Sequence, residues 1–220
     1  MKHVDRGPYV TLWSGRRWHF LDPQPTDVHA SDWVGLAYVN RFGGAVGNYS
    51  VLEHQIRGVW LAEFLGLSEA IRLAFLVHDV PEVGPPGDLL GPLVAHLKET
   101  RANGAAHDEV LAIREKAERA VYTRCGVLDV FEDPDQLRIV KKLDAAMCAA
   151  EKRDMLRGCA DIELPEWAPP DRIVPMAPGK VLVEYRWLLG KYAPLLAAEF
   201  REGMGPQKVN APLGRTGDSE

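Results

Sequence analysis

Four side chains that can bind metal ions interrupt apolar helix patterns in this sequence: His54, the adjacent pair His78 and Asp79, and Asp144. Two imidazoles and two carboxylates suit one divalent transition ion, because Zn²⁺, Mn²⁺, Fe²⁺ and Co²⁺ all accept mixed nitrogen and oxygen ligands. In an octahedral shell, such a ligand set leaves two positions for water and substrate. The set therefore predicts metal-assisted hydrolysis.

The helices that must position the two histidines can be recognised from their sequence patterns. Ser50 and Glu53 have the spacing of a capping box, so a helix begins there and His54 lies on its apolar face. In the following helix, His78 lies on the same apolar face as Phe75, about one turn later. Both imidazoles are therefore predicted to point into the protein.

A later helix, opened by Asp133 and Pro134, carries two carboxylates on an otherwise apolar stripe. They belong to Asp144 and Glu151. Burying an isolated ionised carboxylate is so unfavourable that the group must be paired, metal-bound or protonated. We therefore expect Asp144 to be a metal ligand or the partner of one, and Glu151 to pair with a nearby arginine.

Composition favours a single, mainly helical domain. The chain has 220 residues, of which 46% are hydrophobic, and this is enough to bury a full core. Apolar residues recur at helical spacing, which predicts an all-α fold. β-Branched and aromatic residues on both sides of a turn predict a small N-terminal hairpin at about residues 9–21. We expect one domain over residues 1–202 and a flexible tail over residues 203–220.

Charge, cysteine content and hydropathy restrict the surroundings of the protein. The formal net charge of -5 argues against a nucleic-acid polymer as partner, although local basic clusters can hold a small anion. The 3 cysteines lack CxxC spacing, which favours reduced thiols. The N-terminal residues have no apolar signal-peptide region, and no uncharged run approaches the length of a membrane span. We expect a cytoplasmic protein that does not enter membranes.

The order of the candidate ligands resembles the H…HD…D signature of the HD-domain phosphohydrolases, an all-helical superfamily of metal-dependent phosphate ester hydrolases. Flanking motifs make the resemblance specific and follow in family order: Arg41-Phe42, Tyr49-Ser-Val-Leu-Glu-His54, His78-Asp-Val-Pro-Glu82, Gly87-Asp88, Lys141-Lys-Leu-Asp144 and Glu151-Lys-Arg-Asp154. The resemblance covers roughly residues 9–194. It implies an HD-domain helical bundle in which His54, His78, Asp79 and Asp144 are the metal ligands.

Within this superfamily, the sequence is most similar to a compact branch that contains bacterial 5'-deoxynucleotidases and phage dATP triphosphohydrolases. The resemblance implies that Glu82 is the acid/base residue beside the attacking water and that Asp88 is a supporting carboxylate. The cations that it implies for phosphate binding are Arg41, Lys141 and Arg153. Ordinary solvated helix charges are the alternative for Lys141 and Arg153.

Two aromatic residues near the glycine-rich stretch, Trp33 and Phe42, are candidates for stacking on the nucleotide base. Their alternative is a place in the core. Arg41 has an alternative as well, which is an ion pair with Asp32 or Glu53.

The function favoured by the resemblance is a dATP triphosphohydrolase, in which water attacks the α-phosphorus and releases deoxyadenosine and triphosphate. A second ion such as Mg²⁺ would bridge the triphosphate tail. One alternative is a 5'-deoxynucleotidase that acts on monophosphates, and another is a nucleotide-binding HD protein without turnover. The expected partner is a small deoxynucleotide, the expected assembly is a homo-oligomer by analogy with relatives, and the location is the host cytoplasm if the protein is phage-encoded.

Overall fold

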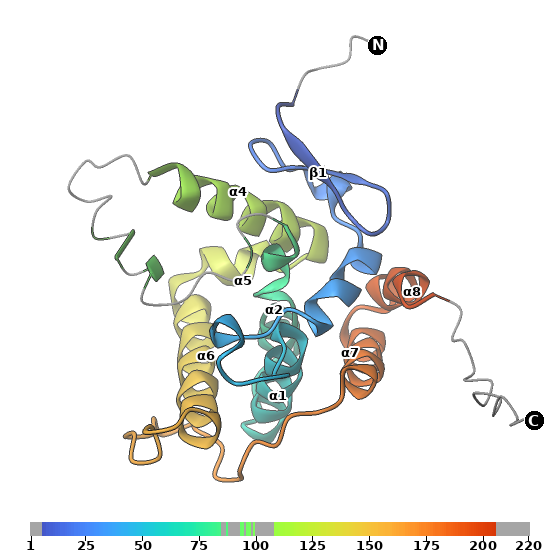
Figure 1. Ribbon diagram of the computed structural model, residues 1–220. Helices are drawn as coiled ribbons and strands as arrows, with labels where there is room; N and C mark the ends of the chain where they lie inside the picture. The colour runs from blue at the N-terminus through green and yellow to red at the C-terminus, as the bar shows by residue number, and fades with distance from the viewer. Residues whose placement is uncertain are drawn as a thin grey trace, which may run out of the picture.

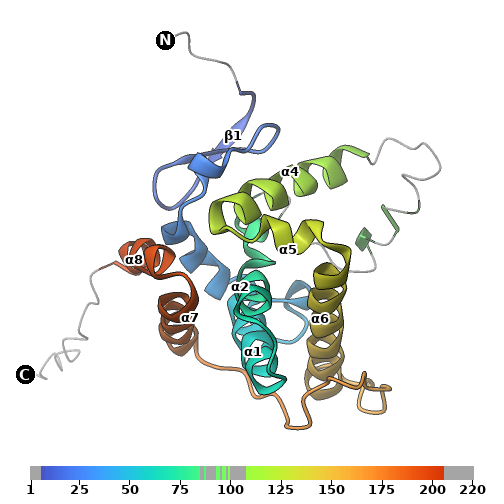
Figure 2. The same ribbon diagram turned by 180° about the vertical axis from the view of Figure 1, so that it is seen from behind.

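The helices of this chain surround a central pair, α1 (Val51–Phe64) and α2 (Glu69–Val77). The computed structural model describes residues 6–84, 87, 93–94, 96–97, 99 and 108–205, so Asp88 and most of the predicted tail lie outside the described residues. Figures 1 and 2 show α6 (Pro134–Met155) on one side of the central pair and α7 (Pro178–Tyr192) with α8 (Pro194–Gly203) on the other. The all-α expectation is confirmed at the level of fold class, since the described chain is mainly helical.

The predicted hairpin is present at the N-terminal end. Strands β1 (Tyr9–Thr11) and β2 (Arg17–His19) pair antiparallel, with Val10 opposite Trp18. The turn between them is fastened to the helical body because the backbone N–H and hydroxyl of Ser14 donate to the Asp32 carboxylate over 2.7 and 2.9 Å. Asp32 belongs to the 3₁₀ segment η2 (Ala30–Ala37), which is wound more tightly than an α-helix.

Helix α1 begins as predicted, but its capping box does not close. The Ser50 hydroxyl accepts from the Glu53 backbone N–H over 3.3 Å. The buried Glu53 carboxylate does not return to Ser50 and instead accepts from the Arg57 side chain and the Met176 backbone N–H. This second set of contacts holds the chain segment before α7 against α1.

The turn after α2 positions the His78-Asp79 pair. Ser68 caps the start of α2, and the helix ends at Val77, so that Asp79 stands between α2 and the 3₁₀ turn η4 (Val80–Val83). The buried Gln55 side chain on α1 is oriented so that its amide nitrogen donates to Leu76 O over 3.2 Å and its amide oxygen accepts from Asp79 N over 3.1 Å. A polar side chain of the first helix therefore closes the backbone of this turn.

Three helices follow: α4 (Asp108–Cys125), α5 (Leu128–Glu132) and α6 (Pro134–Met155). Asp133 is the N-cap of α6, as the sequence predicts, and its carboxylate accepts from the backbone N–H groups of Asp135 and Gln136 over 2.8 and 3.2 Å. The face of α6 that packs into the core buries Met147 and Glu151. Asp144, on the same helix, lies close to His54 of α1.

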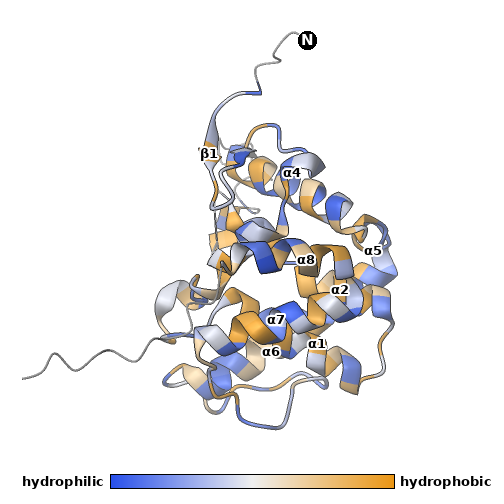
Figure 3. Cartoon of the chain, turned by 90° about the vertical axis from the view of Figure 1, so that its right-hand side faces the viewer, coloured by the Kyte–Doolittle hydropathy of each residue, from blue (hydrophilic) through white to orange (hydrophobic). Residues whose placement is uncertain are grey.

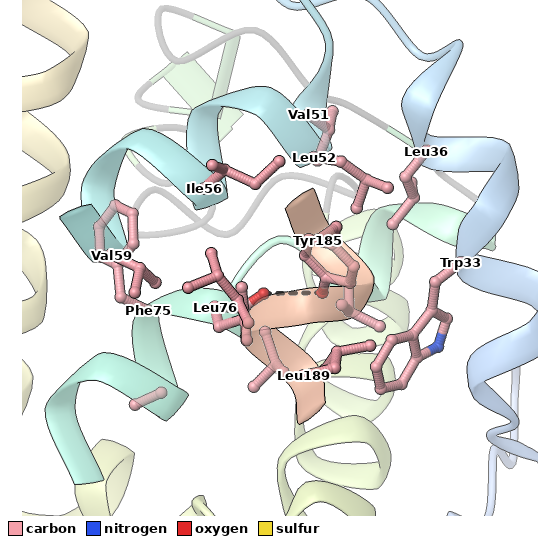
Figure 4. Packing of buried hydrophobic residues seen from close by; sticks show 14 of the residues in the cluster. Trp33, Leu36, Val51, Leu52, Ile56, Val59, Phe75, Leu76, Tyr185 and Leu189 are labelled. Carbon is pink, nitrogen blue, oxygen red and sulfur yellow. Dashed lines mark hydrogen bonds between the residues drawn. The ribbon is translucent and has the colours of Figure 1, made fainter. Parts of the chain in front are cut away.

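The C-terminal apolar stripe is divided between two helices, α7 (Pro178–Tyr192) and α8 (Pro194–Gly203). Pro194 breaks the helix because proline has no N–H to donate and restricts the residue before it. Hydrophilic and hydrophobic residues alternate along both helices in Figure 3, as they do in amphipathic helices. Their buried residues join the core around Trp33, Leu52 and Leu76, where the Tyr185 hydroxyl donates to Leu76 O over 2.8 Å (Figure 4). Within the described residues, no helix has both the length and the apolar character that crossing a bilayer requires.

Gly58 on α1 provides the space for the Phe75 ring, which lies beside both histidines. A Cβ at this position would lie 1.9 Å from Phe75 Cε1, while ring centroids of Phe75 are 5.4 Å from His54 and 4.4 Å from His78. Gly58→Ala is therefore expected to lower the free energy of unfolding by about 1–3 kcal/mol and to weaken metal binding, because the displaced ring moves the imidazoles.

Gly190→Ala on α7 is the matched control, because nothing lies within 4 Å of the added Cβ. Helix propensity alone predicts that this change stabilises the protein by up to about 1 kcal/mol. Urea denaturation measures both variants. A Gly58→Ala protein as stable as Gly190→Ala would contradict the close packing of Phe75.

Candidate metal centre

Three of the four predicted ligands form one compact group. The ligand atoms of His54, His78 and Asp144 all lie within 4.8 Å of one another. His54 Nε2 is 3.4 Å from His78 Nε2 and 3.2 Å from Asp144 Oδ1. The fourth predicted ligand, Asp79, brings Oδ2 to 3.1 Å from His78 Nε2 and 3.8 Å from His54 Nε2. Helices α1 and α6 and the turn after α2 thus place all four side chains together.

The hydrogen bonds on the far side of each imidazole fit a metal site. His54 Nδ1 is 2.6 Å from Glu151 Oε1, and His78 Nδ1 is 2.7 Å from Phe75 O. Each acceptor favours a proton on Nδ1 and so turns the Nε2 lone pair toward the carboxylates of Asp79 and Asp144. When both imidazoles are neutral, their Nε2 lone pairs and the two carboxylates converge, and a divalent cation can supply the positive charge that balances them. The donor set therefore fits a borderline transition ion.

Glu151 organises the buried surroundings of His54. Besides the His54 imidazole, its fully buried carboxylate accepts from the Tyr49 hydroxyl over 2.8 Å and from Arg41 Nε over 3.1 Å. The predicted pairing of Glu151 with an arginine is confirmed. Burial alone would raise the pKa of the Glu151 carboxyl, but His54 and Arg41 outweigh it and lower the pKa from its ordinary value.

Arg41 connects this network to the ligands. Its Nη1 donates to Asp79 Oδ2 over 3.2 Å, and its Nη2 donates to Cys148 Sγ over 3.3 Å. The alternative ion pairs with Asp32 and Glu53 are not formed. Burial would raise the pKa of the Asp79 carboxyl, but His78, His54 and Arg41 together lower it well below its ordinary value. Asp79 is thus held as the charged form that a metal ion needs.

A cavity of about 440 Å³ opens beside this group. Helix α4, α6 and the turn after α2 provide its walls, and His78, Asp79 and Asp144 face into it. The other lining residues are Val94, Leu111, Arg114, Glu115, Glu118, Tyr122, Phe131, Leu137, Val140 and Lys141. Its volume suits a small-molecule substrate rather than a polymer.

Lys141, predicted to bind phosphate, lines the cavity from α6. Glu82 lies in η4, three residues after Asp79, and is partly buried. It is not among the described residues that line the cavity, although its charge adds, after burial and the charge of Glu118, to the causes that raise the pKa of Tyr122 on the cavity wall. The structure thus puts Glu82 at the same end of the molecule as the candidate ligands.

Other predicted substrate contacts lie elsewhere. Trp33 is fully buried in the core, so it has no surface on which a base could stack. Arg153 donates to the Asp154 carboxylate and to Pro169 O, and it does not line the cavity. Phe42 also lies outside the cavity lining, with its ring centroid 5.6 Å from the Arg41 guanidinium carbon and its φ at 57°. Core packing and local ion pairing explain the first two positions.

The contribution of α4 to the cavity was not predicted from the sequence. Leu111, Arg114, Glu118 and Tyr122 recur at helical spacing and all line the cavity. The Tyr122 hydroxyl donates to His78 O over 2.8 Å, which joins this stripe to the metal group. A signal was present, because the stripe carries an Arg and a Glu one turn apart between apolar residues.

Metal affinity is expected to rise with pH through His54. Burial and the charge of Arg41 lower the pKa of this imidazolium, but Glu151 and Asp144 raise it further, to about 9 from 6.5. A metal ion binds the neutral imidazole and must displace this proton, so affinity should rise about tenfold per pH unit below 9. Calorimetric titration with Mn²⁺ at several pH values measures the slope, and an affinity independent of pH would contradict it.

The stability of the metal-free protein should change in the opposite direction. Because the folded-state pKa of His54 lies above 6.5, its contribution is complete below pH 6.5 and is lost as the pH rises through about 9. Urea denaturation of metal-free protein across this range measures the loss. Saturating metal should remove it, since the bound imidazole no longer exchanges a proton.

No model of a known protein family matches the chain. An uncharacterized protein of Rhodobacter capsulatus is 30% identical to it over 156 residues, which is 68% of this chain and 74% of that protein. The chain belongs to the same family as that protein. Because the relative has no assigned activity, the kinship brings no function to this chain.

Proposed function

We propose that this protein is a metal-dependent phosphohydrolase of the HD-domain superfamily, that its substrates are deoxynucleotides, and that dATP is preferred. The observation that carries the proposal is the group of His54, His78 and Asp144, with ligand atoms within 4.8 Å of one another, beside a cavity of about 440 Å³. The sequence resemblance described above supplies the reaction class.

His54, His78, Asp79 and Asp144 would hold the ion, and Glu151 and Phe75 O keep the two imidazoles turned toward it. A divalent ion bound there lowers the pKa of a water molecule and polarises a phosphoryl oxygen. The adjacent cavity admits the substrate, and its apolar residues restrict the water that reaches the phosphate.

Glu82 would accept the proton of the attacking water and return a proton to the leaving oxygen. In the proposed reaction of dATP, the oxygen of water bonds to the α-phosphorus, and the bond from this phosphorus to the 5' oxygen breaks. The products are deoxyadenosine and triphosphate. The same attack on a monophosphate would release inorganic phosphate.

A product analysis tests the proposal. Protein reconstituted with Zn²⁺, Mn²⁺, Co²⁺ or Fe²⁺ is incubated with dATP, dAMP, ATP and the other deoxynucleotides, and the products are separated by chromatography. Deoxyadenosine with intact triphosphate is the expected result. Phosphate from monophosphates alone would make the protein a 5'-deoxynucleotidase, and no turnover with any of these metals would overturn the proposal.

Glu82→Gln is expected to keep bound metal and to lower kcat by about 100-fold or more, because the amide occupies the same space but cannot take a proton. Metal content and kcat are measured on the same preparation. Glu132→Gln, in an exposed pair with Arg119 outside the cavity lining, is the control, and its kcat is expected to change less than threefold, on the order of ordinary mutational scatter. A fully active Glu82→Gln enzyme would remove Glu82 from the mechanism.

A further inference from the structure

The cavity beside the metal group has more acidic than basic lining residues. Its carboxylates belong to Asp79, Glu115, Glu118 and Asp144, and its cations to Arg114 and Lys141. A nucleotide carries several negative charges on its phosphates, and these are repelled by carboxylates in a partly dehydrated space. Binding therefore depends on which of the cations can reach the phosphate chain.

Arg41 is not the cation that meets this need. Its Nε donates to Glu151, its Nη1 to Asp79 and its Nη2 to Cys148, so each guanidinium nitrogen already has a protein partner. It is also absent from the cavity lining. Its place behind the ligands makes it a support for Asp79 and Glu151.

Arg114 has the opposite arrangement. Its Nε donates to Glu118 Oε1 over 2.8 Å, one turn along α4, while Nη1 and Nη2 form no hydrogen bond to any residue that the structure describes. The side chain is 27% exposed and lines the cavity. Nη1 and Nη2 are two of the nitrogens with which arginine forms a bidentate contact to phosphate. Glu118 therefore fixes the guanidinium and leaves its outer end available.

Arg114 lines the same cavity as the candidate ligands His78, Asp79 and Asp144. Burial lowers the pKa of its guanidinium, but the hydrogen bond and charge of Glu118, followed by the charges of Glu82 and Asp79, raise it above its ordinary value. Arg114 therefore lines the space in which the proposed reaction would take place.

We infer that Arg114 binds the phosphate chain of the substrate in the cavity and that Glu118 is the positioning residue that holds it there. The inference rests on the proposed phosphohydrolase function for the identity of the substrate, but not for the contact with phosphate. It assigns to α4 a part in substrate recognition that the resemblance did not include.

Binding of Mg-dATP separates this inference from turnover. Arg114→Ala and Arg114→Lys are made in the Glu82→Gln background, and the dissociation constants for Mg-dATP and for deoxyadenosine are measured by calorimetry. We expect Arg114→Ala to weaken Mg-dATP at least tenfold, with deoxyadenosine and bound metal unchanged. The Mg-dATP dissociation constant of Arg114→Lys should lie between those of the unchanged Arg114 protein and Arg114→Ala, because lysine keeps the charge but loses the bidentate geometry.

Arg119→Ala is the matched control on the same helix, since this arginine is exposed and pairs with Glu132. Made in the same Glu82→Gln background, Arg119→Ala should bind Mg-dATP with the same dissociation constant as the Glu82→Gln protein. A folded Arg114 variant that binds Mg-dATP as tightly as Arg119→Ala would overturn the inference, and the lysine variant decides the matter if the alanine variant does not fold. If the wild type binds Mg-dATP through Arg114 without hydrolysing any nucleotide, the inference stands and the proposed function fails.

Discussion

His78→Ala is expected to remove the bound metal and the proposed phosphohydrolase activity together while leaving a folded protein. The imidazole Nε2 lies 3.4 Å from His54 Nε2 and 3.1 Å from Asp79 Oδ2, at the centre of the ligand group. Its backbone contact with the Tyr122 hydroxyl does not depend on the side chain and remains in the variant. Loss of a direct ligand should weaken metal binding by more than the 10–100-fold seen for supporting partners, so by roughly 100-fold or more.

The control is His19→Ala. His19 lies in the hairpin, where its Nδ1 is 3.3 Å from Gly7 O, and takes no part in the ligand group. Metal content by mass spectrometry and turnover of dATP are measured for both variants, together with Asp144→Ala. If His78→Ala retained metal at the level of His19→Ala, the assignment of the centre would be wrong.

The sequence predicts the helices well wherever a local residue fixes an end. Ser50 and Asp133 are both found as N-caps, because a cap depends on a side chain and the backbone within the same turn. The contact that a capping box predicts from the Glu53 carboxylate to the Ser50 backbone N–H is not formed. A distant partner, the backbone of Met176, competes for its carboxylate, and this partner cannot be recognised from local spacing.

The grouping of the candidate ligands was more predictable than the positions of the candidate substrate contacts. A histidine or carboxylate on an apolar helix face must have a partner, so burial itself marks His54 and Glu151 as special. For an aromatic residue or an arginine, the sequence pattern does not distinguish a substrate contact from a place in the core or in a local ion pair. Trp33 belongs equally well in a core or a base pocket, and Arg153 is satisfied by its neighbour Asp154, so only the tertiary structure separates these outcomes.

The contribution of α4 to the cavity wall could not be recognised from the sequence for a related reason. Glu118 and Arg114 one turn apart look like an ordinary surface ion pair, which contributes little to stability. What distinguishes the pair is the wall opposite, formed by α6 and the turn after α2. That wall comes from residues far away in the sequence, so the local signal of an Arg and a Glu between apolar residues does not by itself indicate a cavity.

Glu151→Gln is expected to weaken both the fold and the metal centre. The buried carboxylate accepts from His54 Nδ1 over 2.6 Å, from the Tyr49 hydroxyl over 2.8 Å and from Arg41 Nε over 3.1 Å. A glutamine keeps the volume, but its amide nitrogen faces a donor, and the Arg41 charge loses a partner. Breaking a buried pair in this way costs on the order of 3–5 kcal/mol of unfolding free energy.

The metal affinity of Glu151→Gln should fall about 10–100-fold, because the carboxylate no longer holds the His54 tautomer and ring orientation. Urea denaturation without metal and calorimetric titration with Mn²⁺ separate the two effects. Glu132→Gln is the control, since its pair with Arg119 is exposed and should contribute at most about 1 kcal/mol. If Glu151→Gln matched Glu132→Gln in both measurements, the buried carboxylate would be an incidental neighbour of the site. If only stability fell, Glu151 would support the fold, and the orientation of His54 would then depend on Asp144 and the ring packing of Phe75.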